Sequence, residues 1–317
     1  MKGKVITKVL NVGEKTKEMM VEYFDEFKRE KTPPYAILQA DDGDTVVTMY
    51  QSGKVVFQGR DADLAADFWI ETEKINYGKA TVTSSDDKKE KKETERKIPL
   101  RITSIGSDEV GTGDYFGPMV VTACYVRRED IPFLESLGIK DSKKMTDEKI
   151  LEVVPKFYNK IKYSSLVLTN KEYNERFASG NNMNKLKAIL HNKVLMNLKN
   201  TGVQYDYIVV DQFAEKYVYY NYLKSSSNVV RDITFLTKAE DKCLSVACAS
   251  LISRFIFIKE FAKISESVGE LLPKGAGTMV DEKAVKIVKK YGFDKLNEIA
   301  KINFKNTEKV KALIEND

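Results

Sequence analysis

The sequence of 317 residues contains one histidine, three cysteines and one tryptophan. Because His191 is the only histidine, catalysis by several histidines and a multi-histidine zinc site are excluded. Cys124, Cys243 and Cys248 lie inside apolar segments without paired metal-ligand spacing, so we expect reduced core thiols. A Ser-His-Asp triad needs only one histidine, so the single His191 does not exclude it, but nothing around His191 resembles a nucleophile elbow. Any catalysis is therefore expected to depend on carboxylates.

Long hydrophobic runs are also missing. No window approaches the run of about 18 apolar residues that a membrane-spanning helix needs, and the N-terminus carries no long apolar segment typical of a secretory signal. A net charge of +5 on a 36.1 kDa chain is only a weak indication of a polyanionic partner. We therefore expect a cytoplasmic protein with no membrane association and no protein partner, with a monomer as the default state.

The sharpest change in composition is SSDDKKEKKETERK, residues 84–97. Of residues 86–97, only Thr94 is uncharged, and none is apolar. Such a stretch cannot bury enough surface to offset the entropy that is lost on ordering. We interpret it as a flexible linker, with a solvated helix as the alternative. It separates an N-terminal domain, residues 1–83, from a C-terminal domain, residues 98–317.

The hydrophobic pattern before the linker predicts a small α+β domain. Alternating apolar and polar residues indicate strands, and apolar residues at helical spacing indicate helices. In order, the expected elements are a strand, a helix, three strands and a last helix: residues 4–10, 14–30, 35–40, 45–50, 54–58 and a helix that Asp61 caps. The product is expected to be a curved antiparallel sheet backed by two helices. No catalytic cluster occurs in this half.

Strands and helices alternate after the linker. We expect strands at residues 100–107, 117–126, 163–169, 207–211 and 232–237. We expect helices at residues 147–159, 184–200, 240–263 and 281–291. This order is typical of an α/β domain in which helices cover a mixed sheet.

Acidic residues follow three of these strands. Asp108 and Glu109 come after the apolar run 100–105, and Asp211 ends the buried strand 207–211. The carboxyl edge of such a sheet is where α/β proteins place their sites. Glu240 comes about one strand later, at the start of a long helix, and its neighbour Asp241 competes with it. The alternatives are a strand end that reaches solvent and acids that stabilise a first helical turn.

Several carboxylates cannot all stay ionised a few ångströms apart unless cations neutralise them. Mg²⁺ or Mn²⁺ suits an oxygen-only site, and two such ions support displacement at phosphorus. The glycines of Gly111-Thr112-Gly113 permit backbone amides to approach a phosphate or sugar closely, although tight turns also use them. Lys143 and Lys144 are candidates for phosphate contacts, with a solvated loop as the alternative.

Five segments together resemble ribonuclease HIII, a bacterial branch of the type 2 ribonucleases H. They are DEVGTGDYFGP (108–118), DSKKMT (141–146), NMNKLKAILHN (182–192), VVDQF (209–213) and TKAEDKCLSVACAS (237–250). The resemblance covers residues 98–317. In element order, residues 1–83 resemble the TATA-box-binding-protein-like domain that precedes the catalytic domain in that family.

The resemblance implies a ribonuclease H-like fold with a five-stranded mixed sheet, and hydrolysis of the RNA strand of RNA–DNA hybrids that leaves 5′-phosphate and 3′-hydroxyl ends. It implies that Asp108 bridges two metal ions and that Glu109 binds one ion near the 2′-OH of the scissile nucleotide. Asp211 is implied to hold the ion that activates water, and Glu240 the ion near the leaving group. The register of the motif favours Glu240 over Asp241.

The resemblance also implies substrate contacts. Its expected residues are Gly111, Thr112, Gly113, Ser142, Lys143 and Asn184. Asn182 and His191 match the family pattern, but His191 is equally consistent with a core or helix-surface position. On the N-terminal sheet, a concave face is expected to contact the hybrid without reading its sequence, through candidates Tyr35, Gln39, Thr48, Tyr50 and Lys54.

Three other functions remain open from the residues. Ribonuclease HII enzymes carry Gly-Arg-Gly where this chain has Gly-Thr-Gly, which weakens the expectation of cleavage beside a single embedded ribonucleotide. A junction resolvase or an integrase-like transferase is the alternative among two-metal nucleases. A nucleic-acid-binding protein without catalysis is the alternative of another class.

Overall fold

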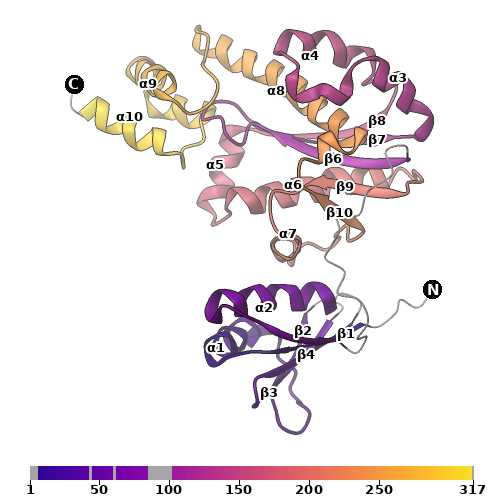
Figure 1. Ribbon diagram of the computed structural model, residues 1–317. Helices are drawn as coiled ribbons and strands as arrows, with labels where there is room; N and C mark the ends of the chain where they lie inside the picture. Colours follow the sequence, from indigo (N-terminus) through magenta and orange to yellow (C-terminus); the bar gives the residue numbers. More distant parts are fainter. Residues whose placement is uncertain (1–5, 43–44, 60–61, 85–101, 316–317) are drawn as a thin grey trace. The chain divides into compact units, whose positions relative to one another are not determined.

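The computed structural model describes residues 6–42, 45–59, 62–84 and 102–315 (Figure 1). The chain divides into two compact units, residues 1–94 and 95–317. Apart from Ser84, which ends a strand, the expected linker lies outside the described residues, so its nature stays a prediction. None of the described helices is long and apolar enough to cross a membrane.

The N-terminal unit is one antiparallel sheet with two helices. Its elements are β1 (Ile6–Asn11), α1 (Glu14–Tyr23), the 3-10 helix η1 (Asp25–Phe27), β2 (Ala36–Asp42), β3 (Thr45–Tyr50), β4 (Lys54–Gly59), α2 (Ala62–Tyr77) and β5 (Thr81–Ser84). The strands are ordered β2-β3-β4-β1-β5, and every neighbouring pair is antiparallel. This matches the expected α+β domain. Two details differ: the first helix ends at Tyr23, and β5 was not predicted.

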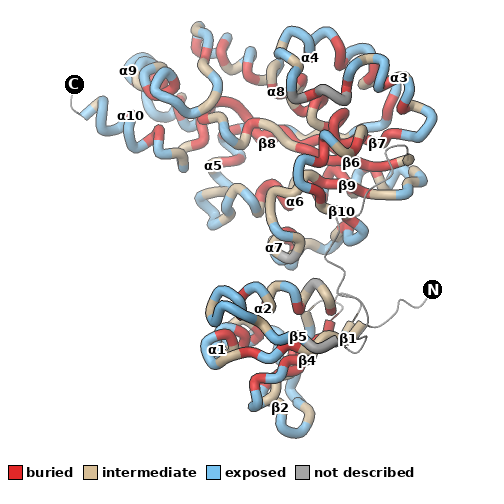
Figure 2. Tube along the Cα trace, viewed as in Figure 1, coloured by how far each residue is buried: buried red, intermediate tan, exposed pale blue. Residues whose placement is uncertain are grey.

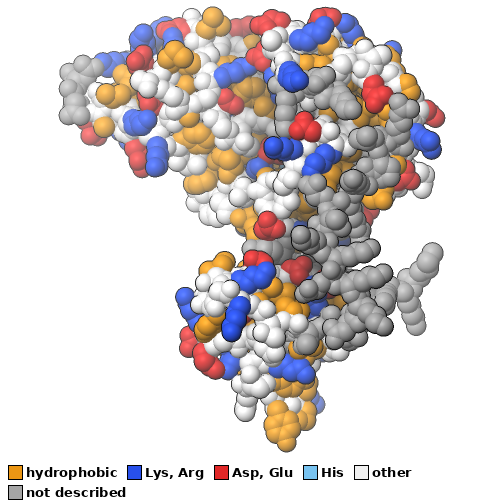
Figure 3. Space-filling view, in the orientation of Figure 1, with side chains coloured by type: hydrophobic (Ala, Val, Ile, Leu, Met, Phe, Trp, Pro, Cys, Tyr) orange, Lys and Arg blue, Asp and Glu red, His pale blue; other side chains and the backbone are white. Residues whose placement is uncertain are grey.

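The two faces of this sheet differ in character. Side chains that alternate along the strands, such as Leu38 and Phe57, pack with Trp69 and the helices in a buried core (Figure 2). The residues between them, including Gln39 and Thr48, face away from the helices, and the Gln39 amide donates a hydrogen bond to Thr48 Oγ1 across the strands (2.9 Å). On the visible surface of both units, Lys and Arg side chains are spread out rather than gathered in one stripe (Figure 3).

The C-terminal unit contains the second sheet. Its elements are β6 (Ser104–Val110), β7 (Met119–Val126), η2 (Arg128–Asp130), α3 (Ile131–Ser136), η3 (Ile139–Lys144), α4 (Asp147–Val153), η4 (Val154–Lys156), β8 (Lys162–Leu168), α5 (Asn170–Ala178), α6 (Met183–Lys199), β9 (Tyr207–Asp211), α7 (Lys216–Tyr222), β10 (Ile233–Leu236), η5 (Ala239–Asp241), α8 (Leu244–Val268), α9 (Thr278–Ile299) and α10 (Lys305–Glu315). The strand order is β10-β9-β6-β7-β8. The first three strands are parallel and β7 is antiparallel to both its neighbours, so the expected five-stranded mixed sheet is confirmed.

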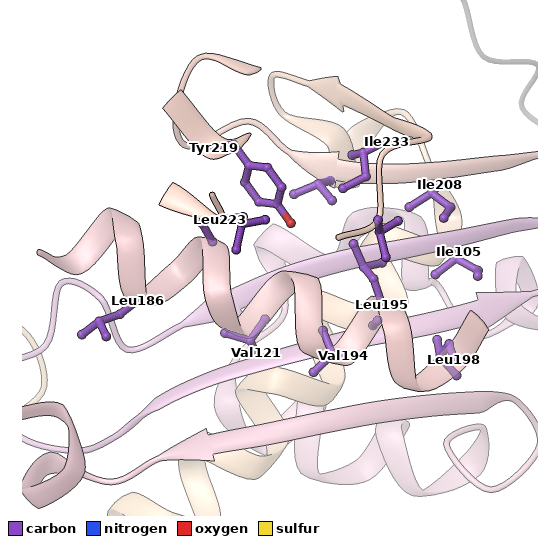
Figure 4. Packing of buried hydrophobic residues seen from close by; sticks show 14 of the residues in the cluster. Ile105, Val121, Leu186, Val194, Leu195, Leu198, Ile208, Tyr219, Leu223 and Ile233 are labelled. Atoms are coloured by element: carbon purple, nitrogen blue, oxygen red, sulfur yellow. The ribbon is translucent and has the colours of Figure 1, made fainter. Parts of the chain in front are cut away.

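Helices cover both faces of this sheet. On one face, Leu195 and Val194 of α6 lie against Val121, Ile105 and Ile208 of the strands (Figure 4). On the other face, α8 runs along β6 and β7 together with α3 and α4 (Figure 1). The backbones of β6 and α8 approach each other closely at Gly106, where an added Cβ would lie 2.2 Å from the backbone nitrogen of Val246. The sheet is therefore held between α6 and α8.

Several expected boundaries are wrong, and two of them concern the site. The strand expected at 100–107 is β6, which continues through Asp108 and Glu109 to Val110. The helix expected to start at Glu240 begins at Leu244, because residues 239–241 form the separate 3-10 helix η5. The helix expected at 147–159 becomes 3-10 at Val154, next to Pro155. The helices α3, α5, α7 and α10 were not predicted.

Candidate active site

Two carboxylates lie side by side at the carboxyl edge of the parallel strands. In the pairing of β6 with β9, Ser107 is opposite Val210, so the next residue on each strand is an aspartate, Asp108 and Asp211. Both aspartates point to the α8 face, since the residues before them, Ser107 and Val210, face α6. The charge of Asp211 raises the pKa of Asp108, as expected for neighbours.

Asp108 is almost buried, with 8% of its surface exposed. Its carboxylate accepts hydrogen bonds from the Ser250 hydroxyl and from the backbone N–H of Glu109 (2.8 Å). Burial is the largest cause that raises the pKa of Asp108 above its usual range, and the negative charges of Glu109 and Asp211 add to it. A neighbouring cation would remove this cost.

Glu109 leaves β6 on the opposite face and meets α6. His191 Nε2 lies 2.9 Å from one carboxylate oxygen, and Lys187 forms an ion pair with the other. His191 Nδ1 is 2.6 Å from the hydroxyl of Ser107. Burial by itself raises the pKa of Glu109, but the hydrogen bond and charge of His191, together with Lys187, outweigh it and lower that pKa. Glu109 is therefore held as a carboxylate.

The third acidic segment is joined to Asp211 by a hydrogen bond. The backbone N–H of Ala239 donates to Asp211 Oδ1 at 2.7 Å. Lys238, in the left-handed conformation with φ 54°, turns the chain into η5. Within η5, Glu240 is only 9% exposed, whereas its neighbour Asp241 is exposed. The structure thus distinguishes two acids that composition alone could not separate.

The glycine segment follows directly after β6. Gly111 has φ 88°, and a Cβ there would lie 2.1 Å from the carbonyl oxygen of Pro118, so the fold itself demands glycine. Gly113 is exposed, and an added Cβ would meet no atom within 4 Å. Packing therefore explains the first glycine but leaves the second without a structural reason.

The residues after Gly113 are anchored by the segments that precede and follow α9. The buried ammonium group of Lys301 donates to the carbonyl oxygens of Asp114 (2.8 Å) and Gly117 (2.5 Å). Asp114 Oδ1 in turn accepts from the backbone N–H of Gly275 at 2.6 Å. These bonds fix the exit of the glycine segment. Sequence patterns had given Lys301 no role.

The other expected substrate residues have different surroundings. Ser142 is buried in η3, and η3 lies against η5, which carries Glu240. The side chain of Lys143 lies outside what the structure describes, and Lys144 is exposed. Asn184 is exposed in the first turn of α6, where Asn182 caps the helix by accepting from the N–H of Lys185 (2.8 Å).

The donor chemistry of this edge fits hard divalent cations. Its acids are carboxylates only, and both causes that raise the pKa of Asp108, burial first and the neighbouring negative charges second, are relieved by a cation. In the described residues, no three carboxylate, imidazole or thiol groups converge on one point. Mg²⁺ is usually held by one or two carboxylates together with water and substrate phosphates, so this spacing is compatible with it.

Sequence reasoning missed the support behind Glu109. His191 had been left between a surface and a core position, and it is fully buried against Glu109 and Ser107. Lys187 was not singled out, although it lies one helical turn before His191 and both contact the Phe213 ring, His191 by stacking and Lys187 through its ammonium group. The sequence signal that could have linked Lys187 to His191 is their spacing of four residues, which places them on the same side of one helix.

Two family models match the chain. Residues 105–307 match the model of Ribonuclease HII, and residues 7–81 match a domain of unknown function (DUF3378). The first match spans more than half of the chain and includes all four acids of the carboxyl edge.

Curated relatives match nearly the whole chain. A Ribonuclease HIII of Bacillus cereus (strain AH187) is 42% identical over 90% of this chain and 91% of its own length. A Ribonuclease HIII of Bacillus mycoides (strain KBAB4) is 41% identical over 94% of this chain and 95% of its own length. Among solved structures, Bst-RNase HIII in complex with Mn²⁺ matches with a TM-score of 0.69 and 35% identity, covering 98% of this chain and all of the other.

Proposed function

The chain belongs to the ribonuclease HIII family, a branch of the type 2 ribonucleases H, and we infer that its active site is formed by Asp108, Glu109, Asp211 and Glu240. The activity is metal-dependent cleavage of the RNA strand in RNA–DNA hybrids. We propose that the cut is endonucleolytic and leaves 5′-phosphate and 3′-hydroxyl ends. The single observation that carries the site is that Asp108 and Asp211 each directly follow the last residue pair of β6 and β9, Ser107 with Val210.

We propose that the four carboxylates hold two divalent cations, Mg²⁺ or Mn²⁺. Asp108 would contact both ions, Glu109 and Asp211 one each, and Glu240 the ion beside the leaving group. Bound there, the ions supply positive charge that lowers the pKa of the attacking water and stabilises the leaving oxygen. The reaction forms a bond from a water oxygen to phosphorus and breaks the bond from phosphorus to the 3′-oxygen, which takes up a proton.

The remaining residues are proposed to bind and orient the hybrid. The backbone amides of Gly111, Thr112 and Gly113 come directly after β6, which ends one residue beyond Glu109, and exposed Gly113 leaves room for a sugar to approach. Contacts from these amides to 2′-OH groups would distinguish RNA from DNA. Ser142 and Lys143 are proposed to contact phosphates, and Asn184 to contact the substrate from the exposed first turn of α6.

We propose that the N-terminal unit raises the affinity for the hybrid through the sheet face that its helices leave open. Gln39, Tyr50 and Lys54 lie on that face by strand alternation, and Tyr35, 85% exposed, precedes β2. Thr48 lies on the same face but is buried, so it supports Gln39 by the hydrogen bond between them. Contacts of this kind would be made to the backbone and groove without reading sequence.

The N-terminal proposal is tested by measuring hybrid affinity across salt concentrations for Lys54→Ala. If Lys54 contacts a phosphate, the variant binds more weakly and the slope of log affinity against log salt falls by about one. Lys74→Ala, on the exposed surface of α2, is the matched control and should behave like the wild type. Unchanged affinity of Lys54→Ala at every salt concentration would contradict the proposal.

The activity and site are tested with four end-labelled duplexes, each with Mg²⁺ and with Mn²⁺: RNA–DNA, RNA–RNA, DNA–DNA, and DNA with one ribonucleotide. Cleavage of the RNA strand in the hybrid alone is expected. Cleavage mainly at the single ribonucleotide would assign the specificity of ribonuclease HII, and cutting of both DNA strands would assign a resolvase-like activity. Binding without any cleavage would leave a nucleic-acid-binding protein. A monomer is proposed, and light scattering of the purified chain measures it.

A further inference from the structure

A group of buried polar side chains between β6 and α6 has no part in the reaction as described. His191 has none of its surface exposed, and both of its ring nitrogens have partners. Nδ1 is 2.6 Å from Ser107 Oγ, and Nε2 is 2.9 Å from Glu109 Oε2. Because an ionised carboxylate only accepts hydrogen bonds, Nε2 is the protonated nitrogen and donates a hydrogen bond to Glu109.

Secondary structure explains why one ring reaches both partners. Ser107 and Glu109 are two residues apart on β6 and therefore lie on the same face of the sheet. Lys187 and His191 are four residues apart on α6 and therefore lie on the same side of the helix. The spacing of the strand and that of the helix thus bring two donors to the two oxygens of one carboxylate.

Phe213 completes the arrangement. Its ring stacks on His191 with the ring centres 5.2 Å apart, and Lys187 Nζ lies 4.1 Å from the same ring centre. The imidazole is therefore fixed by a hydroxyl on one side and an aromatic face on another. This leaves it little freedom to turn away from Glu109.

Stability alone does not explain this cluster. Burying charged and polar groups between a helix and a sheet is costly, and well-packed hydrophobic residues usually stabilise such a position equally well or better. The cluster fixes the direction of a single carboxylate. Since a carboxylate has about four lone-pair positions, two hydrogen bonds still leave positions for a cation.

We propose that His191 is a positioning residue that holds the Glu109 carboxylate in the orientation that binds a divalent cation. Ser107 fixes the imidazole, and Lys187 fixes the second carboxylate oxygen. The inference rests on the proposed function, because it requires Glu109 to be a metal ligand. Loss of a hydrogen-bond partner behind a metal ligand weakens metal affinity by about 10- to 100-fold.

The test measures Mn²⁺ binding to the full chain without nucleic acid, by electron paramagnetic resonance of unbound Mn²⁺. His191→Phe keeps a ring against Phe213 but removes both hydrogen bonds, so its Kd is expected to rise by about 10- to 100-fold. His191→Gln keeps an N–H donor for Glu109 and is expected to recover much of the affinity.

Asn192 provides a matched control. It is the next residue on α6, it is also buried, and its amide bonds the N–H of Val230 and the carbonyl of Asn228 (both 2.9 Å). Asn192→Leu should lower the unfolding temperature and leave the Kd for Mn²⁺ unchanged. A loss of stability by itself would then not imitate the effect expected of His191→Phe.

Hybrid cleavage gives a second readout. In His191→Phe, the Mn²⁺ concentration at half-maximal rate should rise with the Kd, whereas the KM for the hybrid and kcat at saturating Mn²⁺ stay close to wild type. If His191 had a purely structural role, the Mn²⁺ concentration at half-maximal rate would not change independently of the KM for the hybrid and kcat.

Wild-type Mn²⁺ affinity in folded His191→Phe would overturn the inference. If His191→Phe does not fold, Ser107→Ala, which removes one hydroxyl, takes its place. Its Kd for Mn²⁺ must also rise, and an unchanged Kd would overturn the inference. A different variant, Glu109→Gln, tests the proposed function separately. Retention of wild-type Mn²⁺ binding by Glu109→Gln would show that Glu109 is not a ligand.

Discussion

Asp108 and Glu109 are consecutive residues of β6 whose side chains leave opposite faces of the sheet. Asp108 points toward α8 and is bound by Ser250, and Glu109 points toward α6 and is bound by His191. Burial and neighbouring charge raise the pKa of Asp108, whereas His191 and Lys187 overcome the effect of burial and lower that of Glu109. The protein itself thus stabilises the ionised form of Glu109, whereas an added cation would stabilise that of Asp108.

Replacing Asp108 with asparagine should abolish cleavage without preventing folding. The change removes a proposed ligand of both ions, so we expect kcat to fall by about 10³-fold or more, which corresponds to several kcal/mol. Burial and two neighbouring acids raise the pKa of Asp108 and so disfavour its charged form, and a neutral amide should therefore leave the unfolding temperature unchanged or raise it. Cleavage and binding of the hybrid are measured in parallel. Substantial cleavage by Asp108→Asn would contradict the proposed site.

Glu240 and Asp241 form a matched pair of neighbours. Glu240 is buried beside the Ala239–Asp211 hydrogen bond and Asp241 is exposed. Glu240→Gln is therefore expected to lower kcat by at least about 10²-fold, and Asp241→Asn to leave it nearly unchanged. Steady-state rates on the hybrid at saturating Mg²⁺ measure both. The reverse order of effects would exchange the two assignments.

Substitution of the two glycines of the Gly-Thr-Gly segment should affect different properties, stability at Gly111 and substrate binding at Gly113. Gly111→Ala places a Cβ against the carbonyl of Pro118 at positive φ, so it should lower the unfolding temperature. Gly113→Ala meets no protein atom and should fold normally, but it should raise the KM for the hybrid because a methyl group stands where the sugar approaches. Thermal unfolding and steady-state kinetics separate these outcomes. Wild-type kinetics in Gly113→Ala would remove this glycine from substrate binding.

Lys301 should make stability depend on pH. Burial lowers the pKa of Lys301 from its usual 10.5 to about 7, although the charge of Asp114 acts in the opposite direction. Between these two pH values the unfolded chain binds more protons than the folded chain, so stability rises with pH across that window, by up to about 1.4 kcal/mol per pH unit. Below pH 7 this contribution no longer changes.

The measurement compares wild type with Lys301→Met in urea at pH 7.5 and at pH 9.5. The difference in free energy of unfolding should move in favour of the wild type at the higher pH. Circular dichroism follows the unfolding of both units, and fluorescence of Trp69, the only tryptophan, follows the N-terminal unit alone and serves as an internal control. A difference that stays constant with pH would contradict the lowered pKa.

The local features of both units were predictable because they depend on short-range pattern. Flanking turn residues located β3, and a continuous apolar run that stops at an acid located β9, both with the correct ends, because these signals are local in the sequence. The start of α8 was not predictable in this way. Residues 239–243 have helical composition, but the hydrogen bond from Ala239 to Asp211, a residue 28 positions earlier, stabilises a separate 3-10 turn.

The sequence by itself determined the chemistry: one histidine, acids after three strands, and the motifs of a type 2 ribonuclease H. Only the tertiary structure decided how those groups are arranged. Strand pairing placed Asp108 beside Asp211, and the position of α6 turned His191 from an isolated residue into the partner of Glu109. The physical reason is that the face on which a side chain lies follows from local periodicity, whereas its neighbour on that face depends on which distant element packs there.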